Sequence, residues 1–336
     1  MMLKKLGIAL LSAAALAMTG LVSAPAAGAA TNPVPRTLVT FPTSDWGEFA
    51  ESAVMDRDGT LYVSVTTWTA EGSNRGQVWR ITKQGQVSLF GPAIDVGILT
   101  GLALDDEGRL YAGLFDWDDP SIPPGVLHID ARSVTRVLTL PGGTWGEASM
   151  PNGLAFRGGD LYVSDSAHGA IWKTHPRGAR NDVQTTPWFQ DPVLAPTVGF
   201  GINGIVVDRH GIDAVVSDTG TVVRIPMNAA GRPGAVRVVV SDPSLVSADG
   251  LTRGPDGALW ISVNYLDGQS SGAIARVDGR GSLRVVLSGD WLAYPTQPLF
   301  GTTASTATTL YVANGGLDVP GTANVVALKN LLPRVG

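Results

Sequence analysis

The sequence predicts an all-β fold, a six-bladed β-propeller with four antiparallel strands in each blade. Glycine supplies 42 of the 336 residues and proline 22, which is typical of many short strands joined by turns. A motif also occurs six times, at steps of 46 to 52 residues, and this is the length of a propeller blade. Apolar and polar residues alternate within the repeats, which indicates about four strands in each. Two stacked β-sandwich domains are the alternative, but they give no reason for a sixfold repeat.

Each repeat contains the same series of elements. A polar residue opens a short apolar strand, a turn with Asp or Gly follows, and a Leu-Tyr-Val-like strand comes next. The residues that open the six repeats are Glu51, Thr100, Asn152, Asn203, Asp249 and Thr296. The second strands are expected near Leu61, Leu110, Leu161, Ala214, Leu259 and Leu310. Third strands follow Gly76, Gly125, Gly169, Gly220 and Gly272, and runs such as 236–240 supply the fourth.

The first thirty residues have the layout of a secretory signal peptide. Lys4 and Lys5 precede an apolar stretch over 6–22, and small residues follow up to Ala29 and Ala30, where we expect cleavage. An N-terminal membrane anchor is the alternative, but Ser12 and other polar residues dilute the stretch. We therefore expect 1–30 to be removed and 31–336 to form a single propeller domain. That domain would be secreted or otherwise extracytoplasmic, with no stable membrane insertion after cleavage.

Charge and cysteine content exclude several functions. The net charge is −5, or −7 without Lys4 and Lys5, which argues against a nucleic-acid partner because such partners require a basic surface. The absence of cysteine excludes a disulfide framework, a thiolate nucleophile and cysteine-ligated zinc. The 16% of charged residues and 44% of hydrophobic ones do not fit a disordered chain.

The propeller topology would place the polar residue of every repeat at one mouth of the central channel. Two carboxylates, Glu51 and Asp249, and two amides, Asn152 and Asn203, would converge there with no Lys or Arg beside them. Buried acids need a partner, and oxygen donors alone suit a hard cation. Calcium accepts six to eight oxygens in flexible geometry, whereas magnesium prefers a strict octahedron. The alternative is that these residues only open strands, as Asn and Asp often do near turns.

Four motifs carry a resemblance to a known family: Glu51-Ser52, Asn152-Gly-Leu-Ala-Phe156, Asn203-Gly-Ile205 and Asp249-Gly-Leu251. They resemble the regucalcin (senescence marker protein)/gluconolactonase family of six-bladed β-propeller hydrolases. The same ring of residues is similar to that of diisopropyl fluorophosphatase, paraoxonase and drug-responsive lactonase, whereas strictosidine synthase-like proteins lack it. The paraoxonase-type histidine pair and the arginine-rich sugar pocket of a cytoplasmic gluconolactonase are not evident.

The resemblance implies a metal site in the central channel and a hydrolytic activity. The metal would be Ca²⁺ or another divalent cation such as Mg²⁺, Mn²⁺ or Zn²⁺. Its ligands would be Glu51, Asn152, Asn203 and Asp249, with Asp249 also the candidate general base or nucleophile. Thr100 and Thr296 are not assigned as ligands. The family's reactions are the hydrolysis of lactones and, in some members, of phosphotriesters.

The sequence therefore predicts a secreted, calcium-dependent lactonase that acts on a small-molecule lactone or ester. His168, in a loop on the same face of the propeller, is a weaker catalytic candidate, as a proton shuttle. Aromatic residues near that face could line an apolar substrate pocket: Trp46, Trp68, Trp117, Trp145, Trp291 and Tyr294. Two alternatives remain open, a non-catalytic binding propeller with structural calcium and a biosynthetic cyclase or isomerase. The substrate's identity and the oligomeric state remain open.

Overall fold

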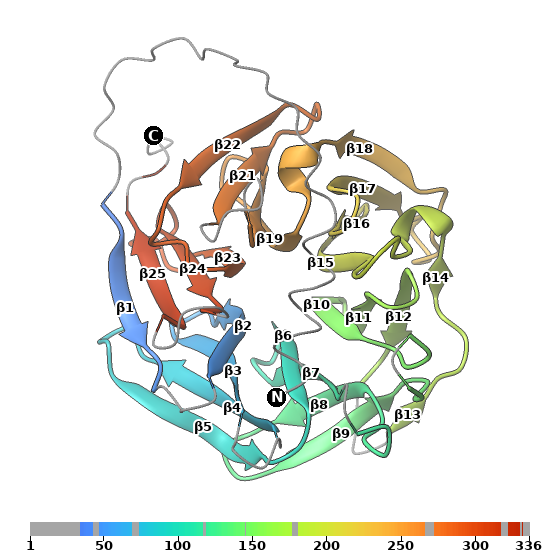
Figure 1. The fold of residues 1–336 in the computed structure, drawn as a ribbon, viewed down its shortest axis with the longest axis horizontal. Helices are drawn as coiled ribbons and strands as arrows, with labels where there is room; N and C mark the ends of the chain where they lie inside the picture. The colour runs from blue at the N-terminus through green and yellow to red at the C-terminus, as the bar shows by residue number, and fades with distance from the viewer. Residues whose placement is uncertain are drawn as a thin grey trace.

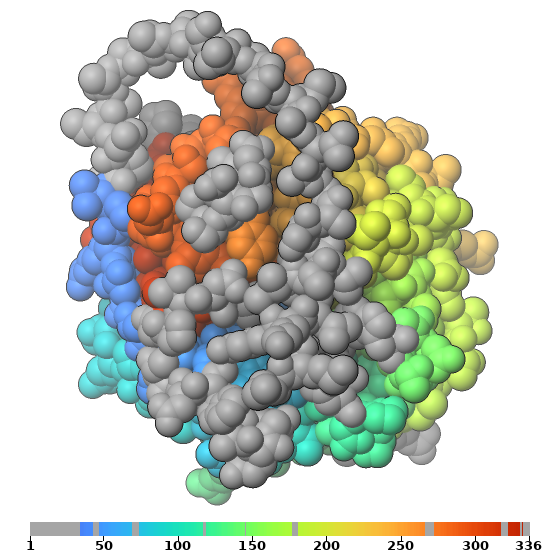
Figure 2. Space-filling view, viewed as in Figure 1, coloured from blue at the N-terminus to red at the C-terminus, as the bar shows by residue number. Residues whose placement is uncertain are grey.

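Six β-sheets radiate from a central channel in the part of the chain that this computed structural model describes (Figure 1). The described residues are 34–42, 47–68, 74–116, 119–144, 146–176, 181–265, 272–316, 322–329 and 331. The signal peptide predicted over 1–30 lies outside them. In the space-filling view, the blades follow one another around the rim in chain order (Figure 2). This arrangement confirms the predicted propeller and excludes the pair of stacked sandwiches.

Each blade is a set of antiparallel neighbours that runs outward from the channel. The innermost strands are β2 (Glu48–Met55), β6 (Ile98–Leu104), β10 (Pro151–Arg157), β15 (Ile202–Asp208), β19 (Ala248–Arg253) and β23 (Pro295–Phe300). The second strands are β3 (Leu61–Trp68), β7 (Leu110–Phe115), β11 (Asp160–Asp165), β16 (Gly211–Val216), β20 (Leu259–Val263) and β24 (Leu310–Asn314). The third strands are β4 (Asn74–Ile81), β8 (Gly125–Ile129), β12 (Ala170–Thr174), β17 (Thr221–Pro226), β21 (Ala273–Val277) and β25 (Asn324–Leu328).

The outermost strands show how the ring is closed. They are β5 (Val87–Ile94), β9 (Val134–Thr139), β14 (Phe189–Gln190), β18 (Arg237–Ser241), β22 (Leu283–Ser288) and β1 (Arg36–Thr40). β1 pairs with β25, so the sixth blade combines the beginning of the described chain with its end. We number the blades one to six from β2, β6, β10, β15, β19 and β23.

Blades two and three depart from the regular pattern. The segment between β12 and β14 first forms β13 (Asp182–Val183), which pairs in parallel with β9 and adds a fifth strand to blade two. The chain then returns to blade three as β14, which has only two residues. Two short 3-10 helices, η2 (Pro192–Leu194) and η3 (Pro243–Leu245), lead into blades four and five. Within the described residues, no helix has the length and apolar character that a membrane span requires.

The turn between the first two strands shows why the repeat folds back at Asp-x-x-Gly. In blade one, Asp56 Oδ1 accepts hydrogen bonds from the backbone N–H of Asp58 (2.9 Å) and Thr60 (2.8 Å). Gly59 takes a φ of +87°, which only glycine adopts at little cost. The apolar side chains that alternate along the strands then pack between neighbouring blades. Trp172 and Trp260 are buried in two of these inter-blade clusters, as their strand positions predict.

Candidate functional site

A bulge interrupts every innermost strand at the residue that opens the repeat. The register with the second strand shifts between Ala50 and Ser52 in blade one and between Leu99 and Leu102 in blade two. Equivalent shifts occur in the other four blades. We call the six residues within these shifts the channel residues: Glu51, Thr100, Asn152, Asn203, Asp249 and Thr296. Bulges often aim a side chain at a functional site, and here they release the channel residues from regular pairing.

Hydroxyl groups of the second strands hold these bulges together. Ser164 Oγ accepts from the backbone N–H of Gly153 (2.7 Å) and lies 2.6 Å from Asn203 O, in the next blade. Ser64 and Ser262 make equivalent contacts, with Thr100 O at 2.9 Å and Thr296 O at 2.5 Å. Each serine therefore links its own bulge to the channel residue of the following blade. This explains the serine that follows the Leu-Tyr-Val-like segment in three repeats.

The glycine that follows a channel residue allows the inner strands to approach closely. A Cβ at Gly153 would lie 2.8 Å from Asn203 O, and one at Gly204 would lie 2.6 Å from Asp249 O. Both distances are shorter than real Cβ contacts, and the atoms they meet are backbone. The Asn-Gly and Asp-Gly pairs of the repeat therefore have a packing reason.

Three channel residues have polar partners at one recurring position, which in blades three, four and five is the residue directly after the second strand. Asn152 Nδ2 donates to Ser166 Oγ (3.2 Å), and Asn203 Nδ2 donates to Ser217 Oγ (3.1 Å). In blade five, Asn264 Nδ2 donates to Asp249 Oδ2 at 2.8 Å. These contacts use the amide N–H groups and leave amide oxygens for another donor or a cation. Sequence reasoning missed the three partners, although each lies at the same place in its repeat.

The threonines of blades two and six behave differently. Thr100 Oγ1 donates to Pro151 O at 2.8 Å. Thr296 Oγ1 lies 2.8 Å from Ala50 O and 3.1 Å from Ala313 O. Both hydroxyls therefore bind the backbone of a neighbouring strand.

The two carboxyl groups of the ring influence each other. Burial raises the pKa of Asp249 from 3.8 to about 7, against the opposing effect of hydrogen bonds from Asn264 and Asn203. The pKa of Glu51 also lies well above its usual 4.5. Desolvation by the surrounding protein is the larger cause, and the negative charge of Asp249 raises the pKa further. Two adjacent acids with raised pKa values form a site where a positive charge would be stabilised.

The donors in the ring fit a hard divalent cation. Asn203 is only 7% exposed, and its Oδ1 has no hydrogen-bond partner among the described residues, which is unusual for a buried amide oxygen. No three His, Cys, Asp or Glu side chains cluster as metal ligands within the described ranges. The predicted set of two carboxylates and two amides contains no such trio. Carboxylate and amide oxygens together are the donors that calcium takes in proteins.

His168 lies in the turn between β11 and β12, on the predicted face. Its Nδ1 is 3.0 Å from Asp165 Oδ2. Asp165 also accepts from Trp172 Nε1 (2.9 Å) and from the backbone N–H of Met150 (2.9 Å). The bond to Asp165 raises the pKa of His168, and a further bond to the backbone of Glu147 contributes. These contacts tie His168 to the segment that leads into blade three, and its catalytic role stays a prediction.

Of the predicted aromatic residues, the three that the structure describes, Trp68, Trp291 and Tyr294, do not gather in one pocket. Phe49 lies between Trp68 and Tyr294, at ring-centroid distances of 6.4 and 5.6 Å, and Tyr265 lies 4.8 Å from Tyr294. This row spans blades one, six and five. Trp291 packs instead against the apolar cluster between blades five and six. Trp46, Trp117 and Trp145 lie outside the described residues.

Comparisons with known proteins support the fold. The chain matches no protein-family model and no curated protein sequence. It is similar to the structure of a catalytically inactive virginiamycin B lyase from Staphylococcus aureus with quinupristin, with a TM-score of 0.54 and 13% identity over 89% of this chain and 99% of that one. A streptogramin B lyase matches with a TM-score of 0.54 and 11% identity over 88% and 97% of the two chains. At such identities the likeness shows the fold alone, which is the β-propeller.

Proposed function

We propose that this protein is a calcium-dependent hydrolase of lactones, related to the regucalcin/gluconolactonase group of propellers and working outside the cytoplasm. The observation that carries the proposal is the asymmetric ring at the channel. Burial raises the pKa of both Glu51 and Asp249, and the charge of Asp249 raises the pKa of Glu51 further. The buried Asn203 Oδ1 has no partner among the described residues. Glu51, Asn152, Asn203 and Asp249 would hold the cation.

The ring's own residues provide the rest of the chemistry. A bound divalent cation supplies Lewis acidity toward the substrate's carbonyl oxygen. Asp249 accepts a proton from the attacking water, whose oxygen bonds to the carbonyl carbon while the ring C–O bond breaks. The proton then passes to the leaving ring oxygen. Without a cation, burial raises the pKa of Asp249 to about 7. A bound cation would lower that pKa, so Asp249 would act as the base through its position beside the water rather than through high basicity. Asn264 Nδ2 donates to both Asp249 Oδ2 (2.8 Å) and Pro295 O (3.1 Å). These two bonds hold the carboxyl group of Asp249, the proposed base, in one orientation.

A substrate panel with and without calcium tests the proposal. Residues 31–336 would be assayed on γ- and δ-lactones and on paraoxon, in calcium and in chelator, alongside Asp249→Asn and the control Asp58→Asn, which lies in an exposed turn. We expect turnover that chelator abolishes and Asp249→Asn reduces about 10²- to 10⁴-fold. Calcium should also raise the melting temperature, since a ligand of the folded state stabilises it. Turnover that is insensitive to chelator would contradict the proposal.

The similarity to lyases makes the type of bond cleavage worth measuring directly. Hydrolysis in H₂¹⁸O adds one ¹⁸O atom to the hydroxy-acid product, whereas elimination gives an unsaturated acid without incorporation. We expect incorporation, because Asp249 is placed to activate water in our proposal. A product without ¹⁸O would replace the hydrolase assignment with a lyase on the same ring. A calcium-stabilised protein with no turnover on any substrate would favour a binding propeller or a biosynthetic cyclase.

A further inference from the structure

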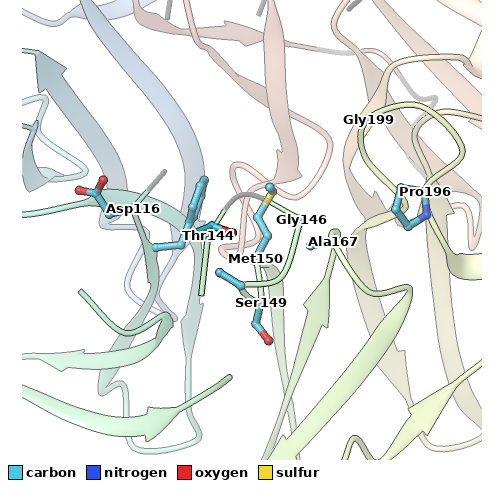
Figure 3. A pocket seen from close by; sticks show the side chains of 10 residues that line it. Asp116, Thr144, Gly146, Ser149, Met150, Ala167, Pro196 and Gly199 are labelled. Carbon is cyan, nitrogen blue, oxygen red and sulfur yellow. The ribbon is translucent and has the colours of Figure 1, made fainter. Parts of the chain in front are cut away.

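A pocket of about 90 Å³ lies beside the channel on the face that carries the loops. Its lining comes from segments far apart in the chain: the end of β7, described residues between Thr144 and Met150, Ala167, and the loop with Pro196 and Gly199. In Figure 3, Thr144, Gly146, Ser149 and Met150 lie between Asp116 on one side and Pro196 and Gly199 on the other. Ile98, Phe115 and Met150 form an apolar cluster at this place, so the pocket has an apolar floor.

The repeat explains why this side of the channel is apolar. Blades three, four and five place Ser166, Ser217 and Asn264 beside their channel residues. The same position in blade two holds Phe115, which lines the pocket. A ligand at the ring would therefore meet polar groups on the Asn203 and Asp249 side and an apolar surface at blade two.

The loop that forms one wall is held in place without a ligand. Asp218 Oδ2 accepts from the backbone N–H groups of Thr197, Val198 and Gly199 at 2.7, 2.8 and 2.9 Å. Its Oδ1 accepts from the N–H of Phe200 at 2.9 Å. One carboxylate thus orders four consecutive backbone groups. A wall fixed before binding lowers the entropy lost when a ligand binds.

The opposite wall is fixed in a similar way. Asp165 Oδ1 accepts from the backbone N–H of Met150 at 2.9 Å and of Ala167 at 3.1 Å. Both of these residues line the pocket. His168 adds its bond to Asp165, which gives this histidine a positioning function beside the pocket.

One polar group in the lining is unpaired. Ser149 is 1% exposed, and its Oγ has no hydrogen-bond partner among the residues that the structure describes. Buried hydroxyls are normally hydrogen bonded, and small-molecule sites typically combine an apolar lining with a few such polar groups. The Oγ itself is inaccessible, so the apolar lining, and not this hydroxyl, is what a ligand in the pocket would contact.

We propose that this pocket binds the short alkyl substituent of a lactone. The proposal rests on the proposed function. A cavity of about 150 Å³ accommodates benzene, so about 90 Å³ admits a chain of roughly four carbons. Longer chains would have to leave the pocket, and an unsubstituted ring would leave it unfilled.

A series of γ-lactones with no, methyl, ethyl, butyl and octyl substituents tests this size limit. We expect KM to fall up to fourfold per added carbon, since burying one methylene is worth about 0.8 kcal/mol, and to rise again at octyl. Ala167→Leu narrows the pocket and should abolish the gain from ethyl and butyl. Ala230→Leu is the matched control in an exposed turn on the opposite face, and it should retain the whole profile.

Binding of alkyl γ-lactams, followed by NMR, separates this inference from the proposed function. Affinity that rises to butyl and falls at octyl, and that Ala167→Leu flattens, supports the pocket even without lactone hydrolysis. Hydrolysis with no dependence on chain length would overturn the pocket and leave the hydrolase standing. Lactam binding that ignores chain length would also overturn it.

Discussion

Blades two and six use their channel residues differently from blades three, four and five. Thr100 and Thr296 direct their hydroxyls to the backbone of neighbouring strands. Asn152 and Asn203 instead donate an amide N–H to a serine of the same blade, and Asn203 also hydrogen bonds to Asp249. The comparison teaches that one bulged position can serve two purposes. A threonine there holds the ring together, while an amide or an acid keeps oxygen atoms available at the axis.

Asp249→Asn should give the largest effect, on activity rather than on folding. The substitution removes the proposed base, so we expect lactone turnover to fall about 10²- to 10⁴-fold. In chelator, its unfolding midpoint should equal or exceed that of the wild type because a buried charge has been removed. Kinetics and urea unfolding on the same preparation check both points. If Asp249→Asn instead unfolded at a lower urea concentration than the wild type and lost activity for that reason, Asp249 would have a structural role, like Thr100 and Thr296.

Gly204→Ala should cost about 3 kcal/mol of unfolding free energy. Its Cβ would lie 2.6 Å from Asp249 O, and backbone can move only by straining the ring. The control is Gly279→Ala, where an added Cβ meets nothing within 4 Å. Urea unfolding of both variants measures the difference. Equal stabilities would mean that the inner strands are not tightly packed.

Thr296→Val should cost about 2 kcal/mol, since it leaves the buried Ala50 O without its donor. Thr296 is 1% exposed, so water cannot replace the hydroxyl. Thr296→Ser keeps the donor and should recover most of that loss. Calcium affinity, measured by calorimetry, should stay unchanged in both variants. A weaker calcium affinity in Thr296→Val alone would make this hydroxyl a ligand.

A smaller effect concerns pH. Burial raises the pKa of Asp249 from 3.8 to about 7, so between these values the folded, cation-free protein holds a proton that the unfolded chain has released. This contribution to stability is complete below the unfolded pKa and is lost as pH rises through the folded pKa. The slope is at most about 1.4 kcal/mol per pH unit. This contribution is measured as the difference in unfolding free energy between the wild type and Asp249→Asn, both in chelator and at several pH values. Thr296→Val retains Asp249 and should show the same pH dependence as the wild type. A difference that grew with pH would contradict the raised pKa.

The blades could be predicted because each repeat carries its pattern in neighbouring residues. Asp56 and Gly59 form a turn through contacts within five residues, so local sequence was sufficient. The polar residue that opens each repeat was also visible, and the structure places all six at bulges. That they bind calcium stays a prediction.

The remaining features depend on contacts that no local pattern records. The bulges are set by the backbone register between two strands. In the sequence, the one sign of them was the recurring serine of the second strand, at Ser64, Ser164 and Ser262. The parallel strand β13 breaks the repeat because its segment pairs with the previous blade. The pocket was missed because its walls come from four separate segments. Asp218, which orders one wall, resembles any other aspartate in a turn when it is viewed in sequence.

The pairing of β1 with β25 means that the sixth blade, and with it the ring, can close only after both strands have been synthesised. Residues 36–40 are synthesised before blades one to five, and their partner at 324–328 is made after those blades. A nascent or truncated product therefore carries an open β-edge, which invites aggregation or proteolysis. Cells that degrade chains with such edges would selectively retain molecules in which β1 has paired with β25 and the ring is closed.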